Sequence, residues 1–337
     1  MISVGDVEIN DAVFLAPMSG ATDAPFRRQA SRFGAPVVIT EMIAGSELAT
    51  GRQDMVWRIT KPENTFPFVV QLAGRDPKWM YEAARISASA GADIIDINMG
   101  CPSRQVTGGQ SGAALMRDLD LARELIIAAR EGGGLPVSVK MRLGWDDDTL
   151  NAPALAKICE EEHVKLITVH GRTRCQFYTG KADWNKVKEV KLASNLPLIV
   201  NGDIDSSKTA KQAILLSQAD GVMIGRAALG RPWLLGKIAS DLANRPYIEP
   251  TWSEKLSSLC EQVSDSVLLY GDRLGVRVFR KHLAAFIDYS KEIRLNTEDR
   301  NELRGRFCRI SSENDVISAI TSLEAPKTAI CRTEELV

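Results

Sequence analysis

The sequence predicts a closed (β/α)8 barrel followed by a small all-helical domain. Short apolar runs rich in Val and Ile recur from residue 12 to residue 224, and Gly, Pro or Asp bounds each run. Runs of this kind are typical of strands buried on both faces of a parallel sheet. Segments with helical patterning separate them, and this alternation indicates right-handed βα units. Eight such units favour a closed barrel over an open doubly wound sheet.

The runs place the predicted strands along the chain. They are Ala12–Pro17, Val37–Thr40, Pro67–Leu72, Asp93–Ile97, Pro136–Met141, Lys165–His170, Pro197–Val200 and Gly221–Ile224. The clearest helices between them are Pro77–Ala90, Asp120–Glu131, Asn151–Glu161 and Ser206–Gln218. Because barrels of this class carry function at the carboxyl ends of their strands, the residues that follow each run are the candidates for chemistry.

The alternation stops at Asn244–Pro250, where two prolines among polar residues indicate a linker. We therefore expect a barrel domain over residues 1–245, a helical domain over 251–323 and a polar, frayed tail over 324–337. The helices predicted in the second domain are Thr251–Tyr270 with Ser253 as its cap, Gly275–Tyr289, Thr297–Ile310 and Val316–Leu323.

The composition argues against several classes of protein. Among 337 residues, 42 Lys and Arg balance 43 Asp and Glu, so the globally basic surface of many nucleic-acid-binding proteins is absent. The six cysteines are scattered without metal-ligand spacing, which predicts no metal site and a reducing, cytoplasmic setting. The first residues lack the features of a signal peptide, and no apolar run approaches the length of a membrane span.

Cys101 is the strongest candidate for a reactive group. It follows the predicted strand Asp93–Ile97 and stands between Gly100 and Pro102, which shape a turn that presents the thiol. The loop over residues 103–112 is polar and rich in Gly. This context favours a functional cysteine over the alternative of a small buried hydrophobe.

Two other strand ends carry residues that suit a flat ligand. Pro17 and Met18 lie among small residues that would let an aromatic ring approach the backbone, although an ordinary turn explains them equally well. Gln71 lies in an otherwise apolar run, and a buried amide must be hydrogen-bonded. A ligand with donor and acceptor edges is one solution, and a hydrogen-bond network in the core is the other.

The predicted strands Pro136–Met141 and Lys165–His170 carry basic side chains in or directly after them. Lys140 lies within an apolar strand, where an unpaired lysine is rare. A ligand that gathers negative charge would match it, and an internal salt bridge is the alternative. His170 and Arg172 end the following strand and offer ring nitrogens and a planar fork, which suit a phosphate or a nucleobase edge.

The last two strands end in turns that contain glycine, Asn201-Gly202-Asp203 and Gly225-Arg226. Glycine lets backbone N–H groups approach an anion, and the helix expected near Ala227 would point its N-terminus at the same place. Because many barrels hold a phosphate at this pair of strand ends, the sequence predicts a phosphate site here.

A basic cluster lies in the predicted helical domain. Between Arg273 and Arg309, ten basic residues stand against five acidic ones. Arg273, Arg277 and Lys281 share one helix face through their four-residue spacing. Such a face is commonly just solvated, and a surface for RNA is the alternative.

Together these motifs resemble the tRNA-dihydrouridine synthases, most closely their bacterial B-type branch, and the resemblance covers nearly the whole chain. Its specific elements are Ala16-Pro17-Met18, Thr22-Asp23, Gln71, Asn98-Met99-Gly100-Cys101-Pro102, Lys140-Met141-Arg142-Leu143-Gly144-Trp145, His170-Gly171-Arg172-Thr173, Ala182-Asp183-Trp184, Asn201-Gly202-Asp203-Ile204, Gly225-Arg226 and Arg280-Lys281-His282. The family combines an FMN-bearing (β/α)8 barrel with a helical C-terminal domain, which agrees with the architecture predicted above.

The resemblance implies an activity and a set of site residues. FMN reduced by NADPH passes a hydride from N5 to C6 of a uracil in tRNA, and Cys101 donates a proton to C5 from the opposite face. The uridine leaves its stack to reach the flavin. The residues implied to hold the cofactor are Pro17, Met18, Gln71, Lys140, His170, Asn201, Gly202, Asp203, Gly225 and Arg226. Those implied to contact the tRNA are Asn98, Arg172, Arg280, Lys281 and His282. One tRNA needs only a monomer, and no protein partner is expected.

The chain departs from the family pattern at a few positions. Gln105 stands where a lysine is common, Ser111-Gly112 where an Ala-Gly pair is common, and Cys175 replaces a usually polar residue. These departures leave open whether the loop after Cys101 contacts RNA. They do not change Cys101, the residue implied to be the acid.

Three other functions are compatible with the same residues. An FMN-dependent barrel oxidoreductase for a small pyrimidine, similar to a dihydroorotate dehydrogenase, would share the phosphate site and Lys140 but would not need the helical domain. A flavin-free barrel lyase or isomerase for a phosphorylated metabolite would lack flavin absorbance. A non-catalytic RNA-binding regulator would not need Cys101.

Overall fold

A computed structural model of the protein describes residues 1–61 and 66–323, so the tail predicted over 324–337 lies outside the described residues. The chain divides into two compact units. The first comprises Met1–Ala228 and Pro232–Ile248, and the second comprises Leu229–Arg231 and the chain from Glu249 onward. Residues 229–231 therefore belong with the helical unit, although the sequence pattern assigned them to the barrel.

The first unit is a closed barrel of eight parallel strands, which confirms the predicted fold class. Its strands are β3 (Val13–Leu15), β4 (Val37–Ile39), β6 (Phe68–Ala73), β7 (Ile94–Met99), β8 (Val137–Arg142), β9 (Leu166–His170), β10 (Leu198–Asn201) and β11 (Gly221–Ile224). They pair in chain order, and the pairing of β11 with β3 closes the ring. Each strand overlaps one of the predicted apolar runs, but β6, β8 and β10 continue one residue past the predicted end and β7 continues two residues past it. The short strand β5 (Ile43–Ala44), which extends the pairing along β6, was not predicted.

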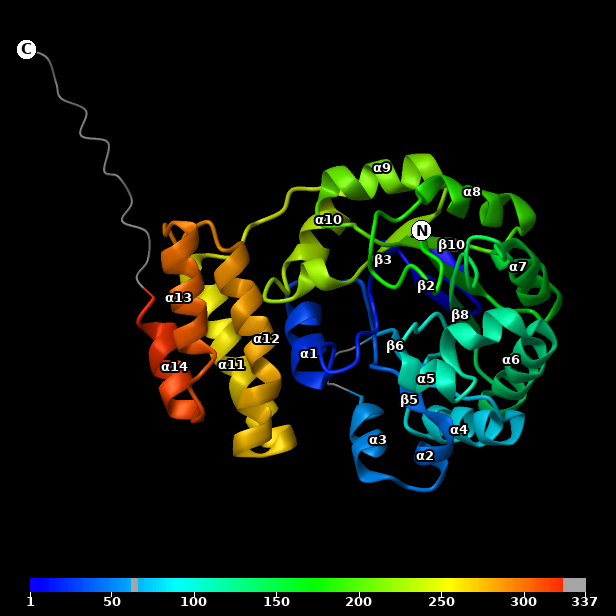
Figure 1. Cartoon of the computed structure of the whole chain (residues 1–337), viewed down its shortest axis with the longest axis horizontal. Coiled ribbons are helices and arrows are strands. Elements are labelled where there is room, and N and C mark those ends of the chain that lie inside the picture. The colour runs from blue at the N-terminus through cyan, green and yellow to red at the C-terminus, as the bar shows by residue number, and fades with distance from the viewer. Residues whose placement is uncertain (62–65, 324–337) are drawn as a thin grey trace, which may run out of the picture. The chain divides into compact units, whose positions relative to one another are not determined.

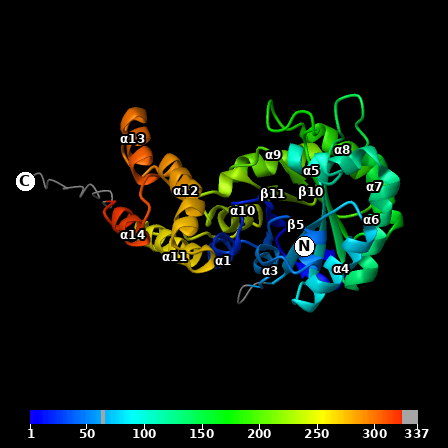
Figure 2. The same cartoon turned by 60° about the horizontal axis from the view of Figure 1, so that its bottom comes forward.

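Helices form a layer outside the strands (Figures 1 and 2). They are α1 (Ala24–Arg32), α2 (Gly45–Ala49), α3 (Gln53–Arg58), α4 (Pro77–Ser89), α6 (Leu119–Gly133), α7 (Ala152–Glu161), α8 (Trp184–Ala193), α9 (Ser207–Ser217) and α10 (Leu234–Leu242). Their ends follow local capping chemistry. The Asp118 carboxylate accepts a hydrogen bond from the N–H of Leu121 at the start of α6, and Gly134 ends that helix in the left-handed conformation.

Side chains alternate along each strand between the helical layer and the barrel interior. In β7, for example, Ile95 and Ile97 pack in the core beneath the helices, while Ile94 belongs to a second apolar cluster in the interior. An antiparallel hairpin of β1 (Ile2–Val4) and β2 (Val7–Ile9), which the sequence analysis missed, packs against that interior cluster. The apolar part of the interior is thus near the amino ends of the strands.

Polar residues take the interior positions nearer the carboxyl ends. The strand register aligns Gln71 with Asp96, Asp96 with Ser138, and Asn98 with Lys140. It also aligns His170 with Asn201. The pleat of the strands therefore gathers these polar side chains at the end of the barrel where the loops carry the candidate residues.

The second unit is helical, with α11 (Trp252–Tyr270), α12 (Asp272–Tyr289), α13 (Thr297–Phe307) and α14 (Glu313–Thr321). Thr251, rather than the predicted Ser253, caps α11, because Thr251 and Glu254 form a reciprocal capping box. Trp252 stacks on Phe286 with ring centroids 5.5 Å apart. Over the described parts of both units, no helix has the length and apolar character that a membrane crossing requires.

Candidate active site

Cys101 follows β7 on a loop whose backbone is held from several sides. The Oδ1 atom of Asn98 accepts hydrogen bonds from the N–H groups of Cys101 at 2.9 Å and Gly100 at 3.2 Å. The carbonyl of Cys101 accepts a bond from the N–H of Ala113 at 3.1 Å. The thiol is free and half-buried. The loop therefore fixes the backbone of a cysteine whose sulfur can still be reached.

Gly112 lets the chain return closely past this cysteine. Its φ is +61°, and a Cβ built on it would lie 2.9 Å from the carbonyl oxygen of Cys101 and 3.1 Å from the Cβ of Cys101. Both the backbone conformation and the space therefore require glycine at this position. The Gly-rich character of the loop, which the sequence analysis used as a sign of function, has this steric cause.

Arg142 connects the Cys101 loop with the loop after β9. Its Nε donates to the carbonyl of Gly100 at 2.8 Å, and its Nη1 donates to the carbonyls of Thr173 at 2.7 Å and Phe177 at 2.9 Å. Burial lowers the pKa of Arg142 to about 10, which leaves the guanidinium charged at neutral pH. Sequence reasoning did not select Arg142 as a site residue, although its place two residues after Lys140 puts both on the same face of β8.

A buried carboxylate lies beneath the Cys101 loop and was also missed. Asp96 accepts hydrogen bonds from Ser138 Oγ at 2.7 Å and from Gln71 Nε2 at 2.6 Å. Burial raises the pKa of Asp96 to about 6, against the opposing effects of Gln71, Ser138 and the charge of Lys140. Its position between apolar residues of one strand, Ile95 and Ile97, was the available signal.

Gln71 lies in the hydrogen-bonded core network that the sequence left open as one alternative. Its Nε2 donates to Asp96, and its Oε1 accepts from Asn98 Nδ2 at 2.7 Å. The side chain is fully buried. Each end of the amide thus has an internal partner, and a direct bond from Gln71 to a ligand stays a prediction.

Lys140 has no such internal partner in the described part of the chain. Over residues 1–61 and 66–323 the structure contains no hydrogen bond or ion pair of its ammonium group, so the salt-bridge alternative is not formed there. Burial lowers the pKa of Lys140 to about 8, and the positive charge of Arg142 adds to this effect, while Asp96 and Cys101 oppose it. A half-buried ammonium with unused donors is suited to an anionic or carbonyl-rich ligand.

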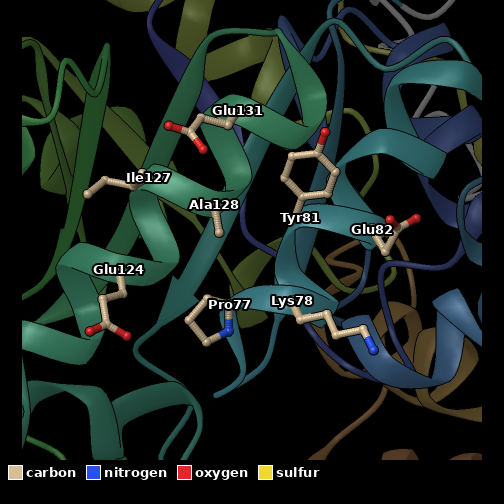
Figure 3. Close-up of a pocket in the computed structure, with 8 residues that line it drawn as sticks. All are labelled: Pro77, Lys78, Tyr81, Glu82, Glu124, Ile127, Ala128 and Glu131. Carbon is tan, nitrogen blue, oxygen red and sulfur yellow. The ribbon is translucent and has the colours of Figure 1, made fainter.

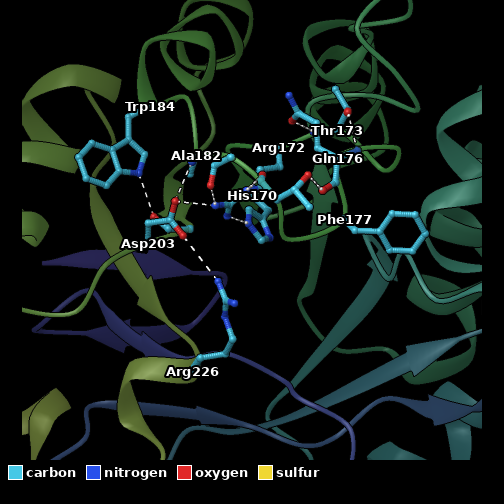
Figure 4. Close-up of polar contacts among 12 residues, drawn as sticks. His170, Arg172, Thr173, Gln176, Phe177, Ala182, Trp184, Asp203 and Arg226 are labelled. Carbon is cyan, nitrogen blue, oxygen red and sulfur yellow. Dashed lines mark hydrogen bonds and ion pairs between the residues drawn. The ribbon is translucent and has the colours of Figure 1, made fainter. Parts of the chain in front are cut away.

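His170 and Arg172 lie together at the end of β9 (Figure 4). The Nη1 of Arg172 lies 3.2 Å from His170 Nε2, which must be the acceptor because a guanidinium has only donors. The ring proton of a neutral His170 is then on Nδ1. Burial lowers the pKa of His170 well below its usual range, and the charges of Arg142, Lys140, Arg172 and Arg226 act in the same direction. His170 is therefore a neutral ring at physiological pH.

The donors of Arg172 are used within the protein. Its Nε donates to the carbonyl of Thr179 at 3.0 Å, and its Nη2 donates to the carbonyl of Gly180 and to Asp203 Oδ2 at 2.8 and 2.7 Å. The side chain is buried. The structure supports a role in holding the loop over 173–180, and contact of Arg172 with substrate stays a prediction.

Asp203 organises the turn after β10. Besides Arg172, its Oδ2 accepts from the N–H of Ala182 at 2.7 Å, and its Oδ1 lies 3.7 Å from Arg226 Nη2 (Figure 4). Trp184 Nε1 donates to the carbonyl of Gly202 at 3.0 Å. Gly202 has a φ of +115°, and a Cβ there would lie 2.9 Å from the His170 ring. The turn is therefore fixed against His170, while the side chain of Arg226 remains 60% exposed.

The ends of β10 and β11 together offer donors to an anion. In the described structure, the backbone N–H groups of Gly202, Asp203 and Gly225 have no acceptor. Asn201 Nδ2, in contrast, donates to the carbonyl of Met223 at 2.8 Å and joins the two strand ends. N–H groups without an acceptor beside an exposed arginine suit a phosphate, and the phosphate site itself stays a prediction.

Pro17 and Met18 lie half-buried at the neighbouring strand end. The Met18 carbonyl accepts from the N–H groups of Ala21 and Thr22, so the residues form a hydrogen-bonded turn. A Cβ built on Gly225 would lie 3.6 Å from Met18 Sδ, in ordinary contact distance. Gly225 thus leaves a methyl-sized space beside the thioether, where a ligand could lie against the backbone.

In the helical unit, the three residues of the Arg280-Lys281-His282 motif differ in exposure. His282 is 1% exposed, so the prediction that its side chain contacts RNA is corrected. It lies on the face of α12 that also buries Phe279 and Phe286. Arg280 donates to the carbonyl of Ile310 at 2.9 Å, and Lys281 is half-buried. A helix has an inner face, and three consecutive residues cannot all avoid it.

Two further arginines on α12, Arg273 and Arg277, are exposed. Other basic residues of the cluster have internal partners. Arg304 pairs with Asp288 at 2.9 Å, and Arg300 donates to backbone carbonyls that include those of Ser290 and Ile293. The exposed basic face is therefore smaller than the count of basic residues suggested.

A separate cleft of about 490 Å³ lies on the helical layer between α4 and α6 (Figure 3). Its lining residues are Pro77, Lys78, Tyr81, Glu82, Glu124, Ile127, Ala128 and Glu131. None of them is a candidate site residue, and Glu82 is engaged by Arg85. In residues 1–61 and 66–323, no group of three His, Cys, Asp or Glu side chains is placed to hold a metal ion.

Comparison with known families gives a match over most of the chain. The family model described as dihydrouridine synthase (Dus) matches residues 14–321. A probable tRNA-dihydrouridine synthase of Rhodobacter capsulatus is 47% identical over 291 residues, which are 85% of this chain and 89% of the relative. One from Rickettsia conorii is 45% identical over 285 residues, 84% of this chain and 86% of the relative. The tRNA-dihydrouridine synthase B of Xanthomonas axonopodis is 39% identical over 283 residues, 84% of this chain and 85% of the relative.

Solved structures show the same fold at low identity. The 6-hydroxypseudooxynicotine amine oxidase of Pseudomonas geniculata aligns with a TM-score of 0.57 and 15% identity, covering 76% of this chain and 52% of that longer chain. Histamine dehydrogenase from Rhizobium sp. 4-9 aligns with a TM-score of 0.52 and 14% identity, covering 78% of this chain and 50% of that one. The chain therefore corresponds to about half of each of these proteins.

Proposed function

This chain belongs to the dihydrouridine synthase family, and we propose that it reduces the C5=C6 bond of a uridine in tRNA with FMN as cofactor and NADPH as reductant. The observation that carries the proposal is the Cys101 loop. A half-buried thiol stands at the carboxyl end of a barrel strand, and its backbone is held by Asn98 and Ala113. Such a thiol can deliver a proton to a fixed point above the barrel interior.

Cys101 acts as the acid of the reaction. Its Sγ donates a proton to C5 of the uracil, and solvent restores the proton after each turnover. A thiol suits this work because its pKa lies closer to neutrality than that of an alcohol. The hydrogen bonds from the N–H groups of Gly100 and Cys101 to Asn98 fix the backbone that carries the sulfur, and proton transfer to a bound base requires such a defined geometry.

When bound, FMN supplies the hydride that saturates C6, and NADPH replenishes it. The residues present fit this group. The unused N–H groups of Gly202, Asp203 and Gly225 would hold its phosphate together with Arg226. The Lys140 ammonium, which has no partner among the described residues, would neutralise negative charge on the flavin ring, and Met18 would pack against that ring beside Gly225.

His170, Asn98 and Arg172 complete the proposed site. The neutral His170 ring offers one Nδ1–H donor without adding charge. Asn98 lines the space near Cys101, and Arg172 keeps the loop over 173–180 in place through three carbonyl and carboxylate partners. Gln71 and Asn201 also hold bonds within the barrel interior, and their contact with the cofactor stays a prediction.

The helical unit supplies the tRNA surface in this proposal. The exposed Arg273 and Arg277 lie on α12 with Lys281, at a spacing that puts all three on one face. Side chains of this kind bind phosphates, and such binding weakens steeply with salt. The enzyme works as a monomer in the cytoplasm, where the described free cysteines stay reduced.

The test is mass mapping of dihydrouridine in tRNA from cells that lack the gene, with the wild-type gene returned on a plasmid. We expect a dihydrouridine to disappear at a defined tRNA position and to return on complementation. A purified protein without flavin absorbance would instead indicate the flavin-free lyase. Unchanged dihydrouridine in the tRNA, together with turnover of a free pyrimidine, would establish the dihydroorotate dehydrogenase-like alternative.

A further inference from the structure

We propose that Asp96 is a positioning residue for the Cys101 thiol, acting through the side chains of Gln71 and Asn98. Three hydrogen bonds in series connect the carboxylate with the cysteine. Gln71 Nε2 donates to Asp96 Oδ2 at 2.6 Å, Asn98 Nδ2 donates to Gln71 Oε1 at 2.7 Å, and the N–H of Cys101 donates to Asn98 Oδ1 at 2.9 Å. We call this series the Asp96 relay.

All bonds of the Asp96 relay run in one direction, and the carboxylate sets that direction. An ionised carboxylate accepts hydrogen bonds and cannot donate them. Gln71 must therefore turn its NH2 group toward Asp96, which leaves its oxygen for Asn98. Asn98 in turn gives its NH2 group to Gln71 and keeps its oxygen for the backbone of the Cys101 loop. If Gln71 turned over, its NH2 group would face that of Asn98, and Asn98 would have to turn over as well. Its NH2 group would then face the N–H of Cys101, and that bond would be lost.

The surroundings of Asp96 make this direction stable. Ser138 Oγ donates to the other carboxylate oxygen at 2.7 Å, so both oxygens act as acceptors. Lys140 on β8 is the charged residue near the Asp96 carboxylate, and its positive charge favours the ionised form of Asp96. Asp96, Gln71 and Asn98 are all buried, so bulk water has little access to replace a broken bond of the relay.

The relay meets a second support at the same loop. Arg142 holds the carbonyl of Gly100, and the relay holds the N–H groups of Gly100 and Cys101. Removing the relay leaves Arg142 and the bond from Ala113 in place, so the loop loosens without unfolding. The expected result is a thiol that is easier to reach from solvent and less well placed for proton transfer. The effect of this change on catalysis rests on the proposed function, but the greater accessibility of the thiol does not.

The experiment measures alkylation of Cys101 by iodoacetamide in the flavin-loaded protein, peptide by peptide, with the exposed Cys175 as internal reference. Asp96→Leu removes the acceptor, and we expect the ratio of Cys101 to Cys175 modification to rise by about threefold or more because access to the thiol increases. Asp96→Asn can still accept from Gln71 while its NH2 group donates to Ser138, so its ratio should stay within about twofold of wild type.

Ile97→Ala is the matched control. Ile97 lies on the same strand, is fully buried and packs under the helices on the opposite face. Its loss costs packing without touching the relay, so the ratio should not change. An Asp96→Leu ratio equal to that of Ile97→Ala overturns the proposal, and so does an Asp96→Asn ratio as high as that of Asp96→Leu.

If Asp96→Leu does not yield folded protein, Gln71→Met breaks the same series one bond nearer to Cys101 and should raise the ratio in the same way. An unchanged ratio in folded Gln71→Met overturns the proposal. Alkylation ratios that follow these expectations in a protein that forms no dihydrouridine would refute the proposed function and leave the relay standing.

Discussion

The guanidinium of Arg142 donates a hydrogen bond from Nε to the carbonyl of Gly100 at 2.8 Å, and this bond fixes the residue before the candidate acid. The same side chain reaches Thr173 and Phe177 through Nη1. The guanidinium group of Arg142 thus joins the loop after β7 with the loop after β9. A lysine carries the same charge but cannot make these divergent contacts.

Arg142→Lys should therefore lower kcat by about tenfold or more and reduce the free energy of unfolding by roughly 1–3 kcal/mol, because buried carbonyls lose their donors. Steady-state kinetics and urea denaturation measure the two effects. Arg130→Lys is the control, since Arg130 also binds a carbonyl, that of Glu162, but does so in the helical layer. Equal kcat values for Arg142→Lys and wild type would refute the connecting role.

Burial of Asp96 makes stability depend on pH. Its pKa rises from 3.8 to about 6 in the folded protein, so the folded state binds the proton more tightly than the unfolded chain. The resulting stabilisation is fully present below pH 3.8 and is lost as pH rises through 6. The shift corresponds to ~3 kcal/mol. Relative to Asp96→Asn, wild type should gain about this much unfolding free energy between pH 7 and pH 4, measured by urea denaturation. If the difference in unfolding free energy between wild type and Asp96→Asn stayed constant from pH 7 to pH 4, the raised pKa of the buried Asp96 carboxyl would be contradicted.

Gly112→Ala should disturb the Cys101 loop. The position has a φ of +61°, and the added methyl group would meet Cys101 at 2.9 Å from its carbonyl oxygen. The expected cost is about 1–3 kcal/mol, with a marked loss of dihydrouridine formation. Gly108→Ala is the matched control, because a Cβ there meets nothing within 4 Å. Thermal denaturation and activity assays compare the two, and similar behaviour of both variants would argue against a steric requirement.

Cys101→Ala should abolish the proton delivery while the flavin stays bound. We expect dihydrouridine formation to fall by about 10²–10⁴-fold, the range typical of a lost general acid. Cys175→Ala, which removes an exposed cysteine of the loop after β9, should retain activity. Flavin absorbance and dihydrouridine mapping measure both variants. Turnover by Cys101→Ala at the wild-type rate would exclude Cys101 as the acid.

The double variant Arg273→Gln with Arg277→Gln should weaken tRNA binding and flatten its salt dependence. Each lost phosphate contact should lower the slope of log K against log salt by about 1. Filter binding over a range of KCl concentrations gives this slope. Arg304→Gln is the control, since Arg304 is already paired with Asp288. If the double variant kept the wild-type slope, this face of α12 would not be the tRNA surface.

Much of the fold followed from local patterns. Short Val- and Ile-rich runs between Gly and Pro residues predicted the eight barrel strands, because strands buried on both faces need continuous apolar sequence. The N-terminal hairpin was missed, since Ile2–Val4 and Val7–Ile9 are short and give a weak alternation signal. Thr251 replaced Ser253 as the cap of α11 because its partner Glu254 lies three residues away, which is the spacing of a capping box.

The sequence by itself determined that Cys101 and the glycine turns after β10 and β11 stand at strand ends and that Lys140 lies within an apolar strand, because strand boundaries and the two-residue alternation are local properties. The tertiary structure alone decided which of their neighbours are already engaged. Gln71 and Asp96 meet through the register of β6 and β7, Arg172 is engaged by loop carbonyls, and His282 is on the inner face of α12. These outcomes depend on contacts between residues far apart in the chain, and no local pattern encodes the partner of a buried donor.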